Sequence, residues 1–235
     1  MQKAANDDLN DGLLQADMPC SATRSDFHRS RFFQQDKPKT FNIMTNIAIF
    51  VSGNGTNCEN IIRYFKDDRN IRVSLVISNR ADAYALVRAA KYGVPSKVLP
   101  KSEINDPARI IPVLADFDVD FIVLAGFMLM VPTFLVDKYH NRIVNIHPSL
   151  LPKFGGKGMY GHHVHEAVKA AGETETGITI HYVSNVCDGG EIIAQFKTKL
   201  APQDDVEEIE AKIHELEQRH FPQVIEQVIN KTAHE

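Results

Sequence analysis

Two polar side chains near the end of an apolar stretch have the types and the spacing for acyl chemistry. Asn145 and His147 alternate with Ile146, so in an extended chain they lie on the same face, and Pro148 ends the strand directly afterwards. An amide can polarise a carbonyl as negative charge builds on its oxygen, and an imidazole beside it can move the proton. A single histidine is more often structural, but this pairing at a strand end favours catalysis.

An acid that could act with this pair lies farther along the chain, in the turn at residues 187–190 (CDGG). The paired glycines allow a strained loop that brings Asp188 into a site, where its carboxylate would stabilise the charged form of a neighbouring imidazole. Alone, such a sequence is usually just a turn. Asp188 is therefore a third catalytic candidate, whose role depends on where the fold places it.

A glycine-bearing turn at residues 52–57 (SGNGTN) has the features of an anion site. Its glycines let the backbone turn sharply, and the helix expected after it directs N–H groups and its positive dipole end at a phosphate. The turn is not a Walker A loop, because the closing Gly-Lys-Ser/Thr is absent. It does not complete GxGxxG either, since Cys58 occupies the third glycine position and residues 78–80 (SNR) offer no acid for a ribose. A tight turn without a ligand is the alternative.

Two further segments leave alternatives open. The run at residues 124–131 (LAGFMLMV) could form an apolar slot for a flat ligand, or it could be buried core. The histidine cluster at 162–165 (HHVH), with His181 and Cys187, raises the question of a metal site. HHxH without a matching second half is a weak zinc signal, so we predict no bound metal.

The elements that must position these residues alternate between strand and helix. Nearly continuous apolar runs are typical of parallel strands covered on both faces, and segments with helical spacing separate them. The expected strands cover residues 46–52, 72–78, 97–99, 120–126 and 142–146, and the expected helices cover 56–68, 81–92, 107–117 and 132–139. This alternation predicts an α/β fold with a doubly wound, mostly parallel sheet.

The C-terminal part of the chain has a mixed character and ends in a long helix. An exposed loop, a helix and two strands are expected at residues 150–160, 162–171, 176–184 and 191–200, respectively. Asp204, followed three residues later by Glu207, resembles a capping box. An amphipathic apolar stripe over residues 206–228 then predicts the C-terminal helix.

The composition fits a globular protein and disfavours several classes. Of 235 residues, 43% are hydrophobic and 24% are charged, and 26 basic against 30 acidic residues give a formal charge of −4. A negative chain has no net field that would hold nucleic acid or an anionic membrane. The longest apolar run, residues 121–131, is about half of what a membrane-spanning helix needs. Three widely spaced cysteines argue against a disulfide framework.

Residues 1–43 differ from the rest of the chain. They carry aspartates followed by basic residues, without helical or strand periodicity, which indicates a mobile leader; a regulatory arm is the alternative. Met44 precedes the first clean strand, so a single folded domain is expected over residues 44–235. No signal-peptide pattern is present and the early acids argue against a transit peptide, so we expect a cytoplasmic protein. The sequence does not predict an oligomeric state.

In their order and spacing, these motifs resemble those of the folate-dependent glycinamide ribonucleotide formyltransferases. The resemblance runs from about residue 44 to about residue 229, and its most specific part is NIHPSLLP at 145–152. The other shared motifs are SGNGTN, SNRADAYAL, LAGFM, ETGITIHYV and CDGG. The resemblance implies a Rossmann-like formyltransferase fold. It also implies transfer of the formyl group of 10-formyltetrahydrofolate to the amine of 5′-phosphoribosylglycinamide in purine synthesis, with small molecules as partners.

The resemblance further implies roles for individual residues. Asn145, His147 and Asp188 would form a catalytic trio that stabilises the oxyanion and moves protons, without a covalent enzyme intermediate. Glu217 would contact the glycinamide end of the acceptor. The implied phosphate-binding residues are Gly55, Thr56 and Asn57, and the implied folate-binding residues are Met128, Leu129, Met130, Val131, Asn145, Ser184, Asn185, Val186, Cys187, Asp188 and Arg109.

Two positions depart from the family pattern. Residues 153–161 (KFGGKGMYG) replace a shorter loop that contacts phosphate in relatives. The family also has an arginine that binds the folate, and either Pro107 or Arg109 of this chain could align with it.

Other functions that fit part of the pattern are disfavoured. Methionyl-tRNA formyltransferase would add a C-terminal barrel and a basic surface. Formyltetrahydrofolate hydrolase would carry a regulatory domain, which 43 irregular residues are too few to build. An NADP-dependent oxidoreductase could use Gly53, Gly55 and Arg80, and absence of nicotinamide binding would exclude it. A non-catalytic module would bind folate or nucleotide without turnover.

Overall fold

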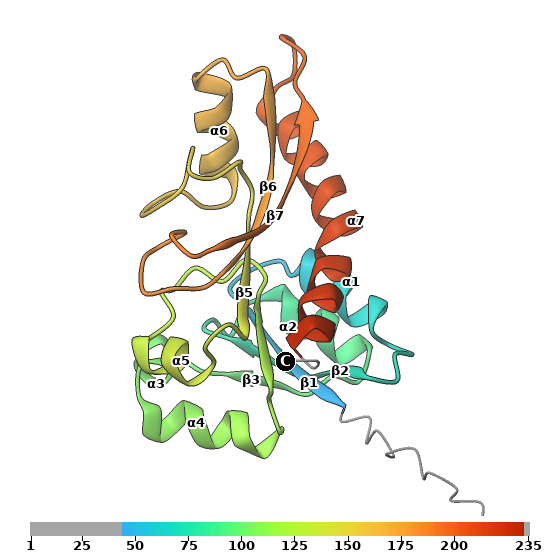
Figure 1. The fold of residues 1–235 in the computed structure, drawn as a ribbon, viewed down its shortest axis with the longest axis vertical. Helices are drawn as coiled ribbons and strands as arrows, with labels where there is room; N and C mark the ends of the chain where they lie inside the picture. Colours follow the sequence, from blue (N-terminus) through green and yellow to red (C-terminus); the bar gives the residue numbers. More distant parts are fainter. Residues whose placement is uncertain (1–43, 233–235) are drawn as a thin grey trace, which may run out of the picture. The chain divides into compact units, whose positions relative to one another are not determined.

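The computed structural model describes residues 44–232, so the expectation of a mobile leader at residues 1–43 lies outside the described residues. From β1 to β6 strands and helices alternate, except that two helices, α3 and α4, follow β3 (Figure 1). The elements are β1 (Thr45–Val51), α1 (Thr56–Tyr64), β2 (Ile71–Ser78), α2 (Tyr84–Lys91), β3 (Ser96–Val98), α3 (Lys101–Ile104), α4 (Pro107–Asp116), β4 (Phe121–Leu124), α5 (Thr133–Lys138), β5 (Ile143–His147), α6 (His162–Ala170), β6 (Glu175–Tyr182), β7 (Ile192–Lys199) and α7 (Val206–Thr232).

The strands of the described residues form a seven-stranded sheet in the order β3-β2-β1-β4-β5-β6-β7. Strands β1 to β5 run parallel, whereas β6 is antiparallel to β5 and β7 is antiparallel to β6. The chain order reverses between β1 and β4, and ligands of open α/β sheets bind at the carboxyl ends of strands beside such a switch point. The doubly wound, mostly parallel sheet, its mixed C-terminal part and the long C-terminal helix are therefore confirmed.

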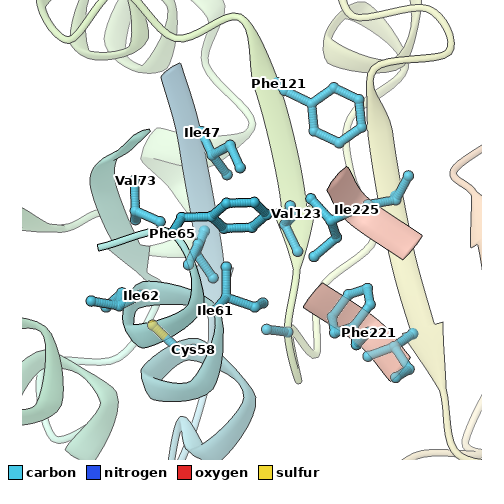
Figure 2. Packing of buried hydrophobic residues seen from close by; sticks show 14 of the residues in the cluster. Ile47, Cys58, Ile61, Ile62, Phe65, Val73, Phe121, Val123, Phe221 and Ile225 are labelled. Carbon is cyan, nitrogen blue, oxygen red and sulfur yellow. The ribbon is translucent and has the colours of Figure 1, made fainter. Parts of the chain in front are cut away.

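Helices on the two faces of the sheet enclose two hydrophobic cores. Strand β1 is buried on both sides, with Ile47 and Ile49 in the core under α1, α2 and α7, and Phe50 in the core beside α4 and α5. Figure 2 shows Phe221 and Ile225 of α7 in the first of these cores. Full burial of one such side chain stabilises the fold by about 1.5–3 kcal/mol. Burial on both faces explains the continuous apolar runs of the parallel strands.

The start of α7 differs by one residue from the predicted capping box. The backbone N–H of Glu208 donates to Oδ1 of Asp205, and the backbone N–H of Asp205 donates to Oε2 of Glu208, each at 2.8 Å. The prediction of Asp204 and Glu207 as the capping pair was therefore wrong. Asp204 instead forms an ion pair with Lys212 of the same helix.

The remaining elements agree with the expected pattern, with ends moved by a few residues. The short helix α3 has no counterpart among the expected elements, because a single turn is too short to show a helical period. No helix within residues 44–232 has the length and apolar character needed to span a membrane.

Candidate active site

A cavity of about 730 Å³ opens at the carboxyl ends of β4 and β5. Its walls come from four segments: the loop after β4 (126–131), the end of β5 (145–148), residues 156–161 of the glycine-rich loop (153–161), and residues 183, 184 and 186–188 after β6. Lys101 of α3 and Asn105 also line it. The cavity thus lies where the topology of an open α/β sheet places ligands.

Strands β5 and β6 together present polar side chains to this cavity. Asn145 is half-buried and His147 is 4% exposed, and both line the cavity, as their alternation along β5 predicts. The antiparallel register places Asn145 opposite His181 of β6. Nδ2 of Asn145 lies 3.1 Å from Nε2 of His181, whose Nδ1 lies 2.8 Å from the carbonyl oxygen of Tyr182. Burial lowers the pKa of His181.

Asp188 reaches the same part of the cavity from the turn between β6 and β7. Its backbone adopts a left-handed φ of 52°. The turn also passes close to β6: a Cβ added at Gly190 would lie only 1.7 Å from the carbonyl oxygen of Tyr182. The carboxylate of Asp188 places Oδ2 3.6 Å from Nδ1 of His147 and Oδ1 3.8 Å from Nε2 of His181. The fold therefore gathers all three catalytic candidates.

The glycine-rich loop contacts two of these groups directly. Nε2–H of His147 donates to the carbonyl oxygen of Phe154 at 2.7 Å. The backbone N–H of Gly156 donates to Oδ2 of Asp188 at 2.9 Å. Both ring nitrogens of His147 therefore face oxygen atoms, and Nε2 is the one that forms a hydrogen bond. This loop, the main departure from the family pattern, is part of the site.

The loop after β4 forms an apolar wall of the cavity. Met128 and Met130 are 56% and 52% exposed, whereas Leu129 and Val131 pack against the core beside α4 and α5. All four side chains line the cavity, and Leu129 and Val131 also pack against the core, so the slot and the core interpretations of this run both hold in part. Ser52 fixes the loop, because its hydroxyl accepts a hydrogen bond from the backbone N–H of Met128 at 2.8 Å.

The turn at residues 52–57, which we call the anion loop, is held in place by α2. Gly55 has a φ of 76°, and a Cβ there would lie 2.4 Å from the Cβ of Ala85. Nε of Arg88 donates to the carbonyl oxygen of Asn54 at 2.9 Å, and Nη2 donates to its Oδ1 at 3.1 Å. Arg88 also pairs with Glu59, and this hydrogen bond lowers the pKa of Glu59 to about 2. A glycine turn is thus fixed at the N-terminus of α1, where helix N–H groups are available to an anion.

Glu217 of α7 connects the anion loop to a chain of histidines. It is 6% exposed, and its Oε2 accepts hydrogen bonds from Nδ2 of Asn57 and from Nδ1 of His214, each at 2.9 Å. Nε2 of His214 lies 3.4 Å from Oε1 of Glu210, whose Oε2 lies 3.2 Å from Nδ1 of His162. The hydrogen bond to Glu217 raises the pKa of His214, and the one to Glu210 raises the pKa of His162.

The structure divides the predicted site residues into two groups. Those that line the cavity are Met128, Leu129, Met130, Val131, Asn145, His147, Ser184, Val186, Cys187 and Asp188. Those at the anion loop and its α7 contact are Gly55, Thr56, Asn57 and Glu217. Asn185 and Arg109 do not line the cavity, and Nη2 of Arg109 lies 3.6 Å from Oε2 of Glu103 instead.

Sequence reasoning missed His181 as a partner of Asn145. Alternation within β6 places His181 on the same face as Thr179, but only the antiparallel register with β5 brings it to Asn145. Lys101, Lys157 and Tyr160 also line the cavity and were not predicted. Among residues 44–232, no three His, Cys, Asp or Glu side chains are grouped so as to hold a metal ion.

An amide, an imidazole and a carboxylate gathered at the strand ends of a doubly wound sheet define a Rossmann-like enzyme suited to acyl group transfer. Residues 45–225 match the family described as formyl transferase. The chain therefore belongs to the formyl transferase family, which confirms the resemblance found in its motifs.

Similar proteins cover most of this chain. It is 37% identical over 187 residues to the phosphoribosylglycinamide formyltransferase of Haemophilus influenzae, covering 77% of this chain and 86% of that relative. The Bacillus subtilis enzyme of the same name is 38% identical over 191 residues, covering 79% and 95%. The crystal structure of phosphoribosylglycinamide formyltransferase from Bacillus halodurans superposes with a TM-score of 0.72 at 35% identity, covering 80% and 97%.

Proposed function

We propose that this chain transfers the formyl group of 10-formyltetrahydrofolate to the amine of 5′-phosphoribosylglycinamide in purine biosynthesis. The observation that carries the proposal is the meeting of Asn145, His147 and Asp188 at a cavity whose wall residue Met128 is hydrogen-bonded to Ser52 of the anion loop. The names of the similar enzymes from Haemophilus influenzae and Bacillus subtilis support the same reaction.

The apolar cavity suits the formyl donor. The pterin, a flat heteroaromatic ring, would lie between the loop after β4 and the segment after β6, with Met128 and Met130 at one wall and Val186 at the other. Backbone N–H and C=O groups of these irregular segments would provide the polar contacts that orient such a ring. Arg109 stays a prediction as a folate ligand, and its substitution by alanine would test it.

The anion loop suits the acceptor. The phosphate would bind at Gly55, Thr56 and Asn57, where the glycine turn meets the N-terminus of α1. Glu217, whose carboxylate already orients Asn57, would contact the glycinamide end. This arrangement would direct the primary amine toward the catalytic trio.

The trio supplies what direct formyl transfer needs. The acceptor nitrogen bonds to the formyl carbon, and negative charge develops on the formyl oxygen as its carbonyl double bond opens. An amide N–H of Asn145 and a ring N–H of His147 would stabilise that oxygen. As the bond between the formyl carbon and the donor nitrogen breaks, Asp188 would help move the amine's proton to the departing nitrogen through water, so that one proton is lost and one gained.

The glycine-rich loop must change its contact during this sequence. His147 donates its Nε2–H to the carbonyl oxygen of Phe154, and its Nδ1 faces Asp188. For the ring to keep Asp188 and reach the formyl oxygen, the Phe154 carbonyl has to give up that hydrogen bond. We therefore propose that seating of the substrates displaces the backbone at Phe154.

The proposal is tested by the turnover of Asn145→Ala and His147→Ala. We expect formyl transfer to fall by about 10²–10³-fold in each, because each removes a donor to the oxyanion. Calorimetric titration should show that both variants still bind the phosphorylated acceptor. His140→Ala, which changes an exposed histidine away from the cavity, is the matched control.

Near-normal turnover in either variant would remove the trio from the mechanism. Incubation of the wild-type chain with 10-formyltetrahydrofolate and a set of amines tests the substrate separately. Consumption of the donor by an amine other than phosphoribosylglycinamide would replace the proposed acceptor. The cytoplasmic location stays a prediction.

A further inference from the structure

His181 of β6 has no role among those that the family resemblance assigns, yet it is buried beside the trio. We propose that His181 is a positioning residue that holds the Asn145 amide with its NH₂ group turned toward the imidazole. The inference rests on the proposed function, because it concerns the residue that would contact the formyl oxygen. The observations behind it are the register between β5 and β6 and the hydrogen bonds of His181 to Asn145 and to Tyr182.

The first hydrogen bond determines which ring nitrogen of His181 carries the proton. Nδ1 of His181 lies 2.8 Å from the carbonyl oxygen of Tyr182, and a carbonyl oxygen only accepts hydrogen bonds. Nδ1 is therefore protonated. In the neutral ring, Nε2 then has a free lone pair and acts only as an acceptor.

The second hydrogen bond transmits this choice to Asn145. Nε2 of His181 lies 3.1 Å from the Asn145 side chain, so the amide must present a donor there. The NH₂ group can do so, whereas the amide oxygen would face the imidazole lone pair and repel it. The backbone carbonyl of Tyr182 thus orients Asn145 through the imidazole between them.

The orientation has a direct catalytic consequence. One N–H of Asn145 is used by His181, and among the described residues no other partner competes for the second N–H. That second N–H is the one available to the formyl oxygen. If the amide rotated by 180° about its last side-chain bond, its oxygen would take the place of the NH₂ group beside the imidazole, and the NH₂ group would move to the other side.

The surroundings of His181 keep the ring neutral. It is 2% exposed, and burial lowers its pKa, with the charge of His147 acting in the same direction. Asp188, whose Oδ1 lies 3.8 Å from Nε2, and the carbonyl of Tyr182 act in the opposite direction. Protonation at Nε2 would turn the acceptor into a donor and would favour the rotated amide.

Nitrogen-15 NMR of the full chain tests the geometry without substrate. We expect one histidine to show a protonated Nδ1 and an unprotonated Nε2 at neutral pH, assigned to His181 by its absence from the spectrum of His181→Gln. A protonated Nε2, or a doubly protonated ring, would overturn the inference. This result does not depend on which reaction the enzyme catalyses.

A double-mutant cycle tests the role in catalysis. His181→Phe keeps a flat ring but removes the acceptor, so kcat should fall by about 10- to 100-fold with little change in either KM. His181→Gln, which offers a side-chain oxygen as acceptor, should recover part of that loss. In an Asn145→Ala background, His181→Phe should lower kcat less than twofold further, because there is no amide left to orient.

Several outcomes separate the alternatives. A full additional loss in the Asn145→Ala background would mean that His181 acts independently of Asn145, and the same cycle with Asp188→Asn reveals coupling to that carboxylate instead. If wild type transfers no formyl group to phosphoribosylglycinamide, the proposed function fails while the NMR result stands. If Asn145→Ala is fully active in that assay, the role of His181 in catalysis fails with that of Asn145. His165→Phe, which removes another buried imidazole outside the cavity, is the matched control and should retain normal kcat.

Discussion

The amide of Asn57, in the first turn of α1, donates a 2.9 Å hydrogen bond to the carboxylate of Glu217, which lies 160 residues later in α7. The same carboxylate oxygen accepts a hydrogen bond from His214. Because Glu217 is buried and Asn57 belongs to the anion loop, the contact ties the C-terminal helix to the proposed phosphate site. In the proposed function, Glu217 is therefore the residue through which α7 would act on the acceptor.

Replacing Glu217 by Gln should weaken acceptor binding selectively. The variant loses the charge that orders Asn57, and hydrogen bonds to charged groups contribute about 1.5–3 kcal/mol. We expect the KM for phosphoribosylglycinamide to rise about tenfold and the KM for the formyl donor to stay constant. Steady-state kinetics with each substrate varied in turn measures both. Glu215→Gln on the exposed side of α7 is the control, and an equal rise in both KM values would contradict the prediction.

His214 should stabilise the fold at low pH more than at high pH. Its pKa is raised above the usual 6.5 by Glu217, with further attraction from Glu210. A raised pKa in the folded state means that the stabilisation is fully present below about pH 6.5 and is lost as the pH rises through the folded value. The melting temperature of His214→Gln, compared with wild type from pH 5 to 9, checks this. A difference that grows toward high pH would contradict it, and His140→Gln controls for loss of an exposed histidine.

Gly190→Ala should damage both the turn and catalysis. A Cβ there would collide with the carbonyl oxygen of Tyr182, so the turn that carries Asp188 must move. We expect a loss of about 1–3 kcal/mol in the free energy of unfolding, and a fall in kcat of about 100-fold as Asp188 leaves His147.

Denaturant unfolding and turnover of the Gly190→Ala protein measure the two effects. Gly53→Ala is the control for stability, because a Cβ at Gly53 has no other atom within 4 Å. Normal turnover in Gly190→Ala would show that the position of Asp188 does not depend on this close approach.

The chain from Met44 onwards should fold and catalyse without residues 1–43. β1 begins at Thr45, and the elements from β1 to α7 supply both cores and every proposed site residue. We expect the shortened chain to keep the melting temperature, kcat and both KM values of the full chain. Thermal unfolding and steady-state kinetics of the two proteins, measured in parallel, test this prediction. A markedly lower melting temperature or kcat, or a markedly higher KM, would assign a role to the first 43 residues.

Much of this fold could be predicted from the sequence, because its parallel strands are buried on both faces. Apolar runs such as those of β1 and β4 leave a clear signal, and a glycine turn at the end of β1 marks the switch point. The start of α7 could not be located to the residue. Two aspartates are adjacent there, and the sequence alone does not show that Asp205 caps the helix whereas Asp204 pairs with Lys212.

The parts of the site that depend on the pairing register of the strands could not be predicted from the sequence. Asn145 and His147 are two residues apart in one strand, so their common face follows from strand geometry alone. His181 meets Asn145 only through the antiparallel pairing of β5 and β6, which a local pattern does not specify. The contacts of Phe154 with His147 and of Gly156 with Asp188 depend on the path of an irregular loop, for which no periodicity exists.

The order in which the proposed site residues occur along the chain also has a consequence for the protein while it is being synthesised. Asn145 and His147 end the last parallel strand, whereas His181, Asp188 and Glu217 follow on the antiparallel strand β6, the turn after it and α7. A ribosome that has released only the parallel half of the sheet has therefore produced a scaffold that lacks three of the proposed site residues.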